Sequence, residues 1–95
     1  MYQLFDFIQD PGHGWIKVPK KMVSKLGIAD KITHYSYERG DYVYLEEDCD
    51  ATTFIEACKS RNITPEFRDR ICRTRQSKVR SYNHYNAYAL VSRGE

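Results

Sequence analysis

The chain has little cysteine, and its three copies, Cys49, Cys58 and Cys72, lack the CxxC spacing of metal and redox sites. An odd number of scattered cysteines predicts free thiols in a reducing compartment rather than a disulfide framework. There is also no apolar run near the roughly 20 residues that a membrane span needs. Because Met1 leads straight into a strand-like segment, we expect no signal peptide. These absences predict a cytoplasmic protein without a membrane partner.

Internal repeats and low-complexity segments are also absent from the 95 residues. A chain of this length is enough for one domain with one modest core. We place that domain at residues 1–90 and expect a frayed C-terminus at residues 91–95. Aromatic residues make up 14% of the chain, and eight of them are tyrosine, so they supply much of the core.

The net charge of +2 conceals an asymmetry between the two halves of the chain. Residues 1–57 carry six Lys or Arg against ten Asp or Glu, whereas residues 58–95 carry nine against three. A basic half can meet nucleic acid or an acidic protein surface. The alternative is that the two halves attract each other within the fold.

Residues 31–46 predict a β-hairpin, because Arg39-Gly40 is a turn signal between two runs rich in aromatic and β-branched residues. With this loop, Tyr37 pairs with Tyr42, and alternation decides which side chains share a face. One face then holds four tyrosines, namely Tyr35, Tyr37, Tyr42 and Tyr44. The other face is aliphatic and includes Ile32, Val43 and Leu45.

A helix is expected directly after the hairpin. Its apolar stripe, at helical spacing, consists of Ala51, Phe54, Ile55 and Cys58. Either Asp48 or Asp50 can accept the free N–H groups at its start, where the helix dipole also favours a carboxylate. Hairpin and helix can then bury their apolar faces against each other.

The other elements follow from periodicity and turn residues. Residues 2–9 and 14–18 are predicted strands separated by a turn at Asp10-Pro11-Gly12. Residues 20–26 predict a short helix that Gly27 ends, and Thr64-Pro65 predicts the start of a basic helix. The expected fold class is therefore α+β, a small antiparallel sheet of about four strands with two or three short helices packed on it.

The arginine-rich segment is the main functional candidate, with six positive charges in the thirteen residues 68–80. Arginine makes forked contacts with phosphate and carboxylate, and tyrosines can stack on bases or anchor a protein partner. The predicted partner- or nucleic-acid-binding residues are Arg68, Arg70, Arg73, Arg75, Lys78, Arg80, Tyr82 and Tyr85. Pairing of these arginines with the acidic cluster at residues 46–50 is the alternative. The conformation of residues 77–95 stays open, and residues 81–88 form either a helical turn or an irregular segment.

Other groups of residues favour structure over chemistry. Carboxylates with a histidine can hold a divalent metal, but no metal-binding spacing such as HxxxH is present, and capping explains the carboxylates. A cysteine nucleophile is opposed by the acidic surroundings of Cys49 and by the core position of Cys58. The turn around His13 and Trp15 forms either a small binding notch or a place where the indole packs on the core. We expect no catalytic residue, no metal and no cofactor.

Residues 13–47 resemble the swapped-hairpin DNA-binding domain of AbrB-type regulators and MazE-type antitoxins. The shared features are Val18-Pro19, Leu26-Gly27-Ile28 and the hairpin, with Ala29-Asp30 in place of the usual Gly-Asp. This resemblance implies a DNA-binding transcriptional regulator or antitoxin that dimerises by exchanging hairpins.

Nearly the whole chain is similar to small proteins of phages and conjugative plasmids, in the combination of HGW, VP, LGI, YLEEDCD and an Arg-rich end. Such mobile elements often encode small proteins that block host defences, including anti-CRISPR and anti-restriction proteins. The resemblance implies a non-enzymatic protein of the host cell cytoplasm, monomeric or homodimeric. Its partner would be a host defence protein or nucleoprotein complex, with DNA or RNA as a further partner.

Overall fold

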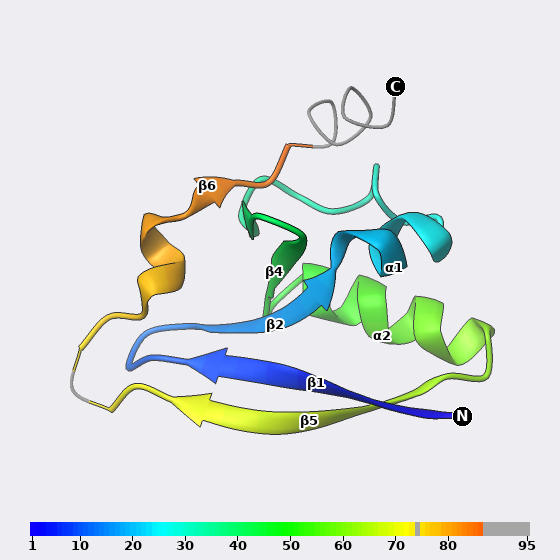
Figure 1. Ribbon diagram of the computed structural model, residues 1–95, viewed down its shortest axis with the longest axis horizontal. Coiled ribbons are helices and arrows are strands. Elements are labelled where there is room, and N and C mark those ends of the chain that lie inside the picture. Colours follow the sequence, from blue (N-terminus) through cyan, green and yellow to red (C-terminus); the bar gives the residue numbers. More distant parts are fainter. Residues whose placement is uncertain (74, 87–95) are drawn as a thin grey trace.

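The computed structural model describes residues 1–73 and 75–86, which form one sheet, two α-helices and one 3-10 turn (Figure 1). In chain order the elements are β1 (Tyr2–Gln9), β2 (Gly14–Pro19), α1 (Lys20–Lys25), β3 (Tyr37–Arg39), β4 (Tyr42–Glu46), α2 (Asp50–Ser60), β5 (Thr64–Ile71), the 3-10 turn η1 (Lys78–Ser81) and β6 (Asn83–His84). Among these described elements, only α2 is a helix of more than two turns. The C-terminus at residues 91–95, which we expect to be frayed, lies outside the described residues.

The sheet has six strands in the order β5-β1-β2-β4-β3-β6 and is mixed. Strand β1 pairs antiparallel with β2 on one side and parallel with β5 on the other. The prediction of an antiparallel sheet of about four strands with two or three helices is therefore wrong. The protein contains more sheet and less helix, mainly because the basic segment is a strand.

Strand β5 occupies the edge of the sheet where the sequence predicts a helix. The N–H groups of Thr64 and Cys72 both donate toward β1, to carbonyl oxygens of Met1 and Gln9 at 2.7 Å. Because alternate residues of a strand direct their polar groups to opposite sides, Pro65 faces the open edge. A proline there removes no ladder hydrogen bond, so Pro65 marks an edge strand rather than a helix start.

The hairpin keeps its predicted faces but not its predicted register. Its loop is Gly40–Asp41, and Tyr37 pairs with Tyr44 rather than with Tyr42. A shift of two residues leaves every side chain on the same face, whereas a shift of one would have reversed them. Tyr35 lies before β3, so it does not belong to the hairpin's tyrosine face.

The main core lies between the sheet and α2. The side chains of Val43, Leu45 and Phe54 are completely buried there. The Phe54 ring meets Phe5 of β1 edge-on, with ring centroids 5.0 Å apart. The structure thus confirms that the aliphatic face of the hairpin packs against the apolar stripe of α2, as Ala51 and Cys58 are also buried.

The start of α2 is capped by Glu46 rather than by Asp48 or Asp50, which corrects the sequence prediction. The Glu46 carboxylate accepts the N–H groups of residues 48–50 at 2.5–2.8 Å. Asp50 is instead buried, and its carboxylate accepts hydrogen bonds from Thr33 and Ser36. Asp50 therefore ties the loop before β3 to the helix.

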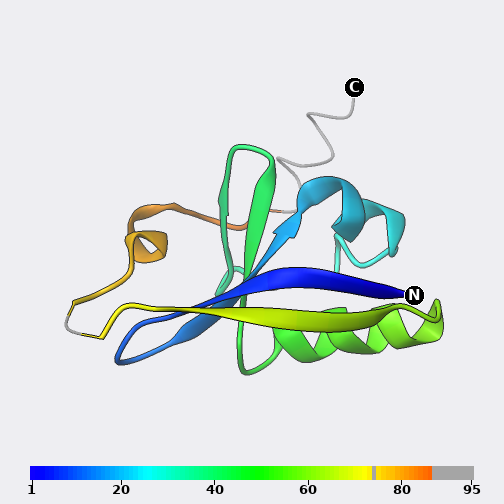
Figure 2. The ribbon, with the colours of Figure 1, turned by 60° about the horizontal axis from the view of Figure 1, so that its bottom comes forward.

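A second, smaller core lies on the face of the sheet opposite α2, which we call the helix-free face. The 3-10 turn η1 lies on this side (Figure 2). Trp15, Tyr44 and Val79 are buried together there. Val79 comes from the C-terminal crossing segment, residues 75–86, which runs from the β5 side of the sheet to β3 and ends its described course with Tyr85 in the main core. The Tyr85 hydroxyl donates to the carbonyl oxygen of Ala29.

Two smaller predictions are confirmed. Helix α1 is followed by its cap residue Leu26 and then by Gly27, whose φ of 71° is the left-handed conformation expected of a residue that terminates a helix. Cys49, Cys58 and Cys72 are all free thiols. Of the helices in the described ranges, none has the length and apolar character needed to cross a membrane.

Candidate functional site

The eight predicted binding residues do not form one continuous stripe. They divide among β5 (Arg68 and Arg70), the residues after it (Arg73 and Arg75), η1 (Lys78 and Arg80) and the rest of the crossing segment (Tyr82 and Tyr85). Two of them have structural roles, two are partly paired with a carboxylate, and the others are exposed or half-buried at the surface.

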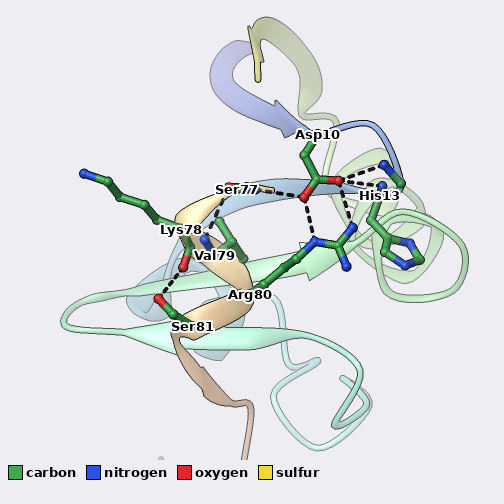
Figure 3. Close-up of polar contacts among 8 residues, drawn as sticks. Asp10, His13, Ser77, Lys78, Val79, Arg80 and Ser81 are labelled. Atoms are coloured by element: carbon green, nitrogen blue, oxygen red, sulfur yellow. Dashed lines mark hydrogen bonds and ion pairs between the residues drawn. The ribbon is translucent and has the colours of Figure 1, made fainter. Parts of the chain in front are cut away.

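Arg80 has a structural role because it joins η1 to the turn between β1 and β2 (Figure 3). The buried carboxylate of Asp10 accepts Nε of Arg80 at 2.6 Å and one of its terminal nitrogens at 2.9 Å. The same carboxylate accepts the backbone N–H groups of Gly12, His13 and Ser77, each at 2.9 Å. Arg80, and then these N–H groups, hold the pKa of Asp10 far below its usual range. The charges of Asp10 and Arg80 therefore neutralise each other within the fold.

Two neighbours complete this arrangement. The Arg80 guanidinium lies 5.7 Å from the centroid of the Trp15 ring. A Cβ atom at Gly12 would lie 2.7 Å from the Arg80 guanidinium, so a side chain there would require the guanidinium to shift. Tyr85 is the second structural residue: it is buried, and burial raises the pKa of its hydroxyl to about 12. Neither Arg80 nor Tyr85 is free to take a partner.

Arg68 and Arg70 both reach Asp6 on the neighbouring strand. The nitrogen–oxygen distances are 2.9 Å for Arg68 and 3.7 Å for Arg70, and both arginine side chains remain more than half exposed. Some arginines of the basic half thus pair with acidic residues of the other half. Their acidic partners are Asp6 and Asp10, however, and not the cluster at residues 46–50.

Two of the other predicted cations, Arg75 and Lys78, line a groove of about 740 Å³ on the helix-free face, which we call the basic groove. Arg70 also lines it, whereas Arg73 is exposed and is not part of its lining. The charged residues of its lining are Lys17, Arg70, Arg75, Lys78, Asp6 and Asp69, four cations against two carboxylates, and the Asp69 carboxylate accepts a hydrogen bond from the Gln9 side chain. The groove also includes Ile8, Tyr44 and Tyr82, which give it an apolar, aromatic part. Burial, and then the neighbouring Tyr82, raises the pKa of the Tyr44 hydroxyl, which stays neutral.

Two of these cations are the most available. Arg75 and Lys78 are exposed, and neither forms an ion pair with another residue in the described ranges. Lys78 points away from the Asp10 cluster (Figure 3). Lys17 was missed in the sequence because it lies in β2, and the pairing of Asp6 with Lys17 brings it beside the groove. The residues next to Lys17 in the sequence give no indication that it pairs with Asp6.

A second cavity, of about 330 Å³, lies at the other side of η1. His13 and Trp15 form part of its wall, although Trp15 is itself buried in the smaller core. Within the described ranges, no group of three or more His, Cys, Asp or Glu is placed to hold a metal ion. Cys58 is buried, which raises the pKa of its thiol, whereas Cys49 is exposed beside the cavity.

The hairpin β3–β4 pairs with β2 of the same chain, whereas a swapped hairpin would complete the sheet of a second chain. Comparisons of the chain with protein-family models, with curated proteins and with solved structures find no match. The function has to be argued from the geometry of the two cavities.

Proposed function

We propose that the protein acts by binding, without turnover, and that the basic groove contacts a polyanionic partner. The observation that carries this proposal is the convergence of Lys17, Arg70, Arg75 and Lys78 from three separate parts of the chain onto one groove. A cluster of cations that the fold assembles from distant segments is more specific than a run of basic residues. Its excess positive charge favours phosphate or carboxylate groups.

A nucleic acid strand fits this groove better than a compact anion does. Cations at the rim can follow a phosphate backbone, and Tyr82, whose ring already carries the Arg39 guanidinium 5.0 Å from its centroid, adds an apolar contact beside them. At the groove, η1 is held by hydrogen bonds of Ser77 and Arg80 to Asp10, so this turn is not free to enter a major groove. Such contacts position a strand without reading its sequence.

The setting we propose is a phage or mobile element whose accessory protein inhibits a host defence nucleoprotein complex. The resemblance of the sequence in HGW, VP, LGI, YLEEDCD and the Arg-rich end is the support for this setting, and the basic groove supports contact with the nucleic acid of such a complex. The inhibitor would act by occupying the path of the guide or target strand. A small binding domain is sufficient for this role because no chemistry is required of it.

The test is fluorescence anisotropy with a labelled single-stranded oligonucleotide of about 20 nucleotides at low salt. The double charge reversal Arg75→Glu with Lys78→Glu should weaken binding at least about tenfold, because it removes two phosphate contacts and adds repulsion. The matched control is Lys21→Glu with Lys25→Glu, a reversal of two exposed charges on α1 outside the groove.

An equal loss of oligonucleotide affinity in the two double variants would show that only net charge matters, and it would contradict binding in the basic groove. Unchanged binding in the folded groove variant would contradict it as well. For the inhibitory role, phage plating on a bacterium with an active nuclease defence should rise when the wild-type protein is expressed, but not with the groove variant. A dimer that prefers one duplex sequence would instead support the regulator interpretation.

A further inference from the structure

The second cavity, beside the basic groove, has the opposite chemistry. We call it the acidic pocket. Its rings are His13, Trp15, Tyr35, Tyr37 and His84. Its carboxylates are Glu46, Glu47 and Asp48. Rings on the wall of a cavity with carboxylates beside them form the environment that favours an organic cation.

The rings form a connected wall rather than isolated contacts. Tyr37 stacks on His84, with ring centroids 4.7 Å apart, and meets Trp15 edge-on at 6.1 Å. Trp15 is buried under the crossing segment, so this part of the wall is rigidly held. Tyr35 is more than half exposed and adds a ring at the mouth of the pocket.

The charge of the pocket is negative for a structural reason. Burial disfavours the ionised form of Glu46, but the N–H groups of residues 50, 48 and 49 outweigh it and lower the pKa of Glu46. Glu47 and Asp48 are exposed, and neither side chain forms a hydrogen bond or ion pair with another residue of the described ranges. The single cation of the lining, Arg80, is already neutralised by Asp10.

We propose that the acidic pocket binds the guanidinium group of an arginine side chain from a protein partner. A guanidinium is flat, stacks on aromatic rings and forks onto carboxylates, which an ammonium cannot do equally well. Arg80 shows the same chemistry within the chain, because its guanidinium is held by a carboxylate at the face of Trp15. The inference does not rest on nucleic acid binding in the basic groove, since the two cavities lie on different sides of η1.

The probe for this test is the blocked peptide acetyl-Gly-Arg-Gly-amide, and the readout is the fluorescence of Trp15, the single tryptophan of the chain. We expect a saturable change with this peptide. The citrulline analogue, which keeps the shape but lacks the charge, should bind about tenfold more weakly because the charge-assisted hydrogen bonds are lost. Equal binding of the two peptides, or no saturable change up to about 10 mM, would overturn the proposal.

Two variants test the carboxylates and an aromatic ring of the pocket separately. Glu47→Gln with Asp48→Asn removes two charges at constant shape and should weaken the arginine peptide about tenfold. Tyr35→Leu keeps an apolar side chain but removes a ring and should weaken it about threefold. Unchanged affinity in either folded variant would contradict the role given to the altered side chains.

The matched control is Glu56→Gln with Glu66→Gln, which removes two exposed carboxylates that do not line the pocket. It should leave peptide affinity unchanged. Oligonucleotide binding, measured on the same proteins, separates this inference from the proposed function. Glu47→Gln with Asp48→Asn should not weaken the oligonucleotide, and Arg75→Glu with Lys78→Glu should not weaken the peptide.

Discussion

At the scale of the residue, Asp10 is the position whose role in the structure differs most from the role that the sequence suggests. In the sequence it is the first residue of a turn, a common place for aspartate. In the structure its carboxylate is buried and accepts hydrogen bonds from two adjacent turn residues and from two residues of the crossing segment. One carboxylate thus holds the smaller core closed.

Replacing Asp10 with Asn should lower the free energy of unfolding by about 1.5–3 kcal/mol at neutral pH, the scale of hydrogen bonds to a charged group. The pKa of Asp10 is lower in the folded state than its ordinary value of 3.8, so its contribution is complete above 3.8 and is lost as the pH falls further. Urea unfolding should therefore show a smaller difference between wild type and variant at pH 3 than at pH 7. Asp41→Asn, in an exposed loop, is the control, and a pH-independent difference would contradict the argument.

The main core makes a second prediction at this scale. Leu45 is completely buried against α2, and Leu45→Ala should lower the free energy of unfolding by about 2–5 kcal/mol, because it leaves a cavity. Leu4, which is 58% exposed, offers the matched substitution, and Leu4→Ala should cost much less. Thermal or urea unfolding measures both. Similar losses in the two variants would mean that the assigned faces of the sheet are wrong.

At the scale of the element, local signals predicted what local interactions determine. The apolar run in residues 2–9, the stripe from Ala51 to Cys58 and the Gly27 terminator all specify structure through neighbours in the chain, and the strand, the helix and the helix end are all observed. Strand β5 could not be found in this way. Its pairing joins Asp6 to Arg68, and a Thr64-Pro65 sequence suits an edge strand as well as a helix start.

In the candidate site, too, the local sequence indicated some residues, and others depend on contacts between distant segments. Arg70, Arg75 and Lys78 were predicted and line the basic groove, but Lys17 depends on sheet register and was missed. The structural use of Arg80 was also missed, because its partner Asp10 is seventy positions away. No composition argument distinguishes an arginine that pairs within the fold from one that is free.

The hairpin loop gives a prediction at the scale of the element. Gly40 has a φ of 57°, and a Cβ atom there would contact nothing within 4 Å, so only backbone strain opposes a side chain. Gly40→Ala should therefore lower the free energy of unfolding by about 1–2 kcal/mol. Gly40→Asn should cost less, because Asn tolerates this conformation. Chemical denaturation compares the three proteins, and an Ala variant as stable as wild type would place the loop elsewhere.

At the scale of the whole molecule, η1 divides the helix-free face into two regions of opposite charge. The basic groove has four cations against two carboxylates, and the acidic pocket has three carboxylates against one paired arginine. A net charge of +2 gives no indication of this separation. One molecule can therefore present a surface for an anion and a surface for a cation side by side, as a nucleoprotein partner would require.

The salt dependence of oligonucleotide binding tests this view. If two to four of the groove cations contact phosphates, log affinity should fall with log salt at a slope of about −1.4 to −2.8 for a single strand. Arg75→Glu with Lys78→Glu should make the slope shallower by about 1.4. Anisotropy titrations at several salt concentrations give both values. A slope near zero would mean that binding, if present, does not use these cations.

The crossing segment also affects the order in which the chain can fold. Many contacts of the main core join neighbouring segments, such as β2 with β4 and β4 with α2, whereas the Asp10–Arg80 contact must close a loop of seventy residues. Closing a long loop is entropically costly and slow. Trp15 and Tyr44 should therefore remain uncovered while the helix side is already assembled, and the fluorescence of Trp15 should reach its native value last during refolding. An intermediate with one bare apolar face is the form of this protein most exposed to aggregation and to chaperones.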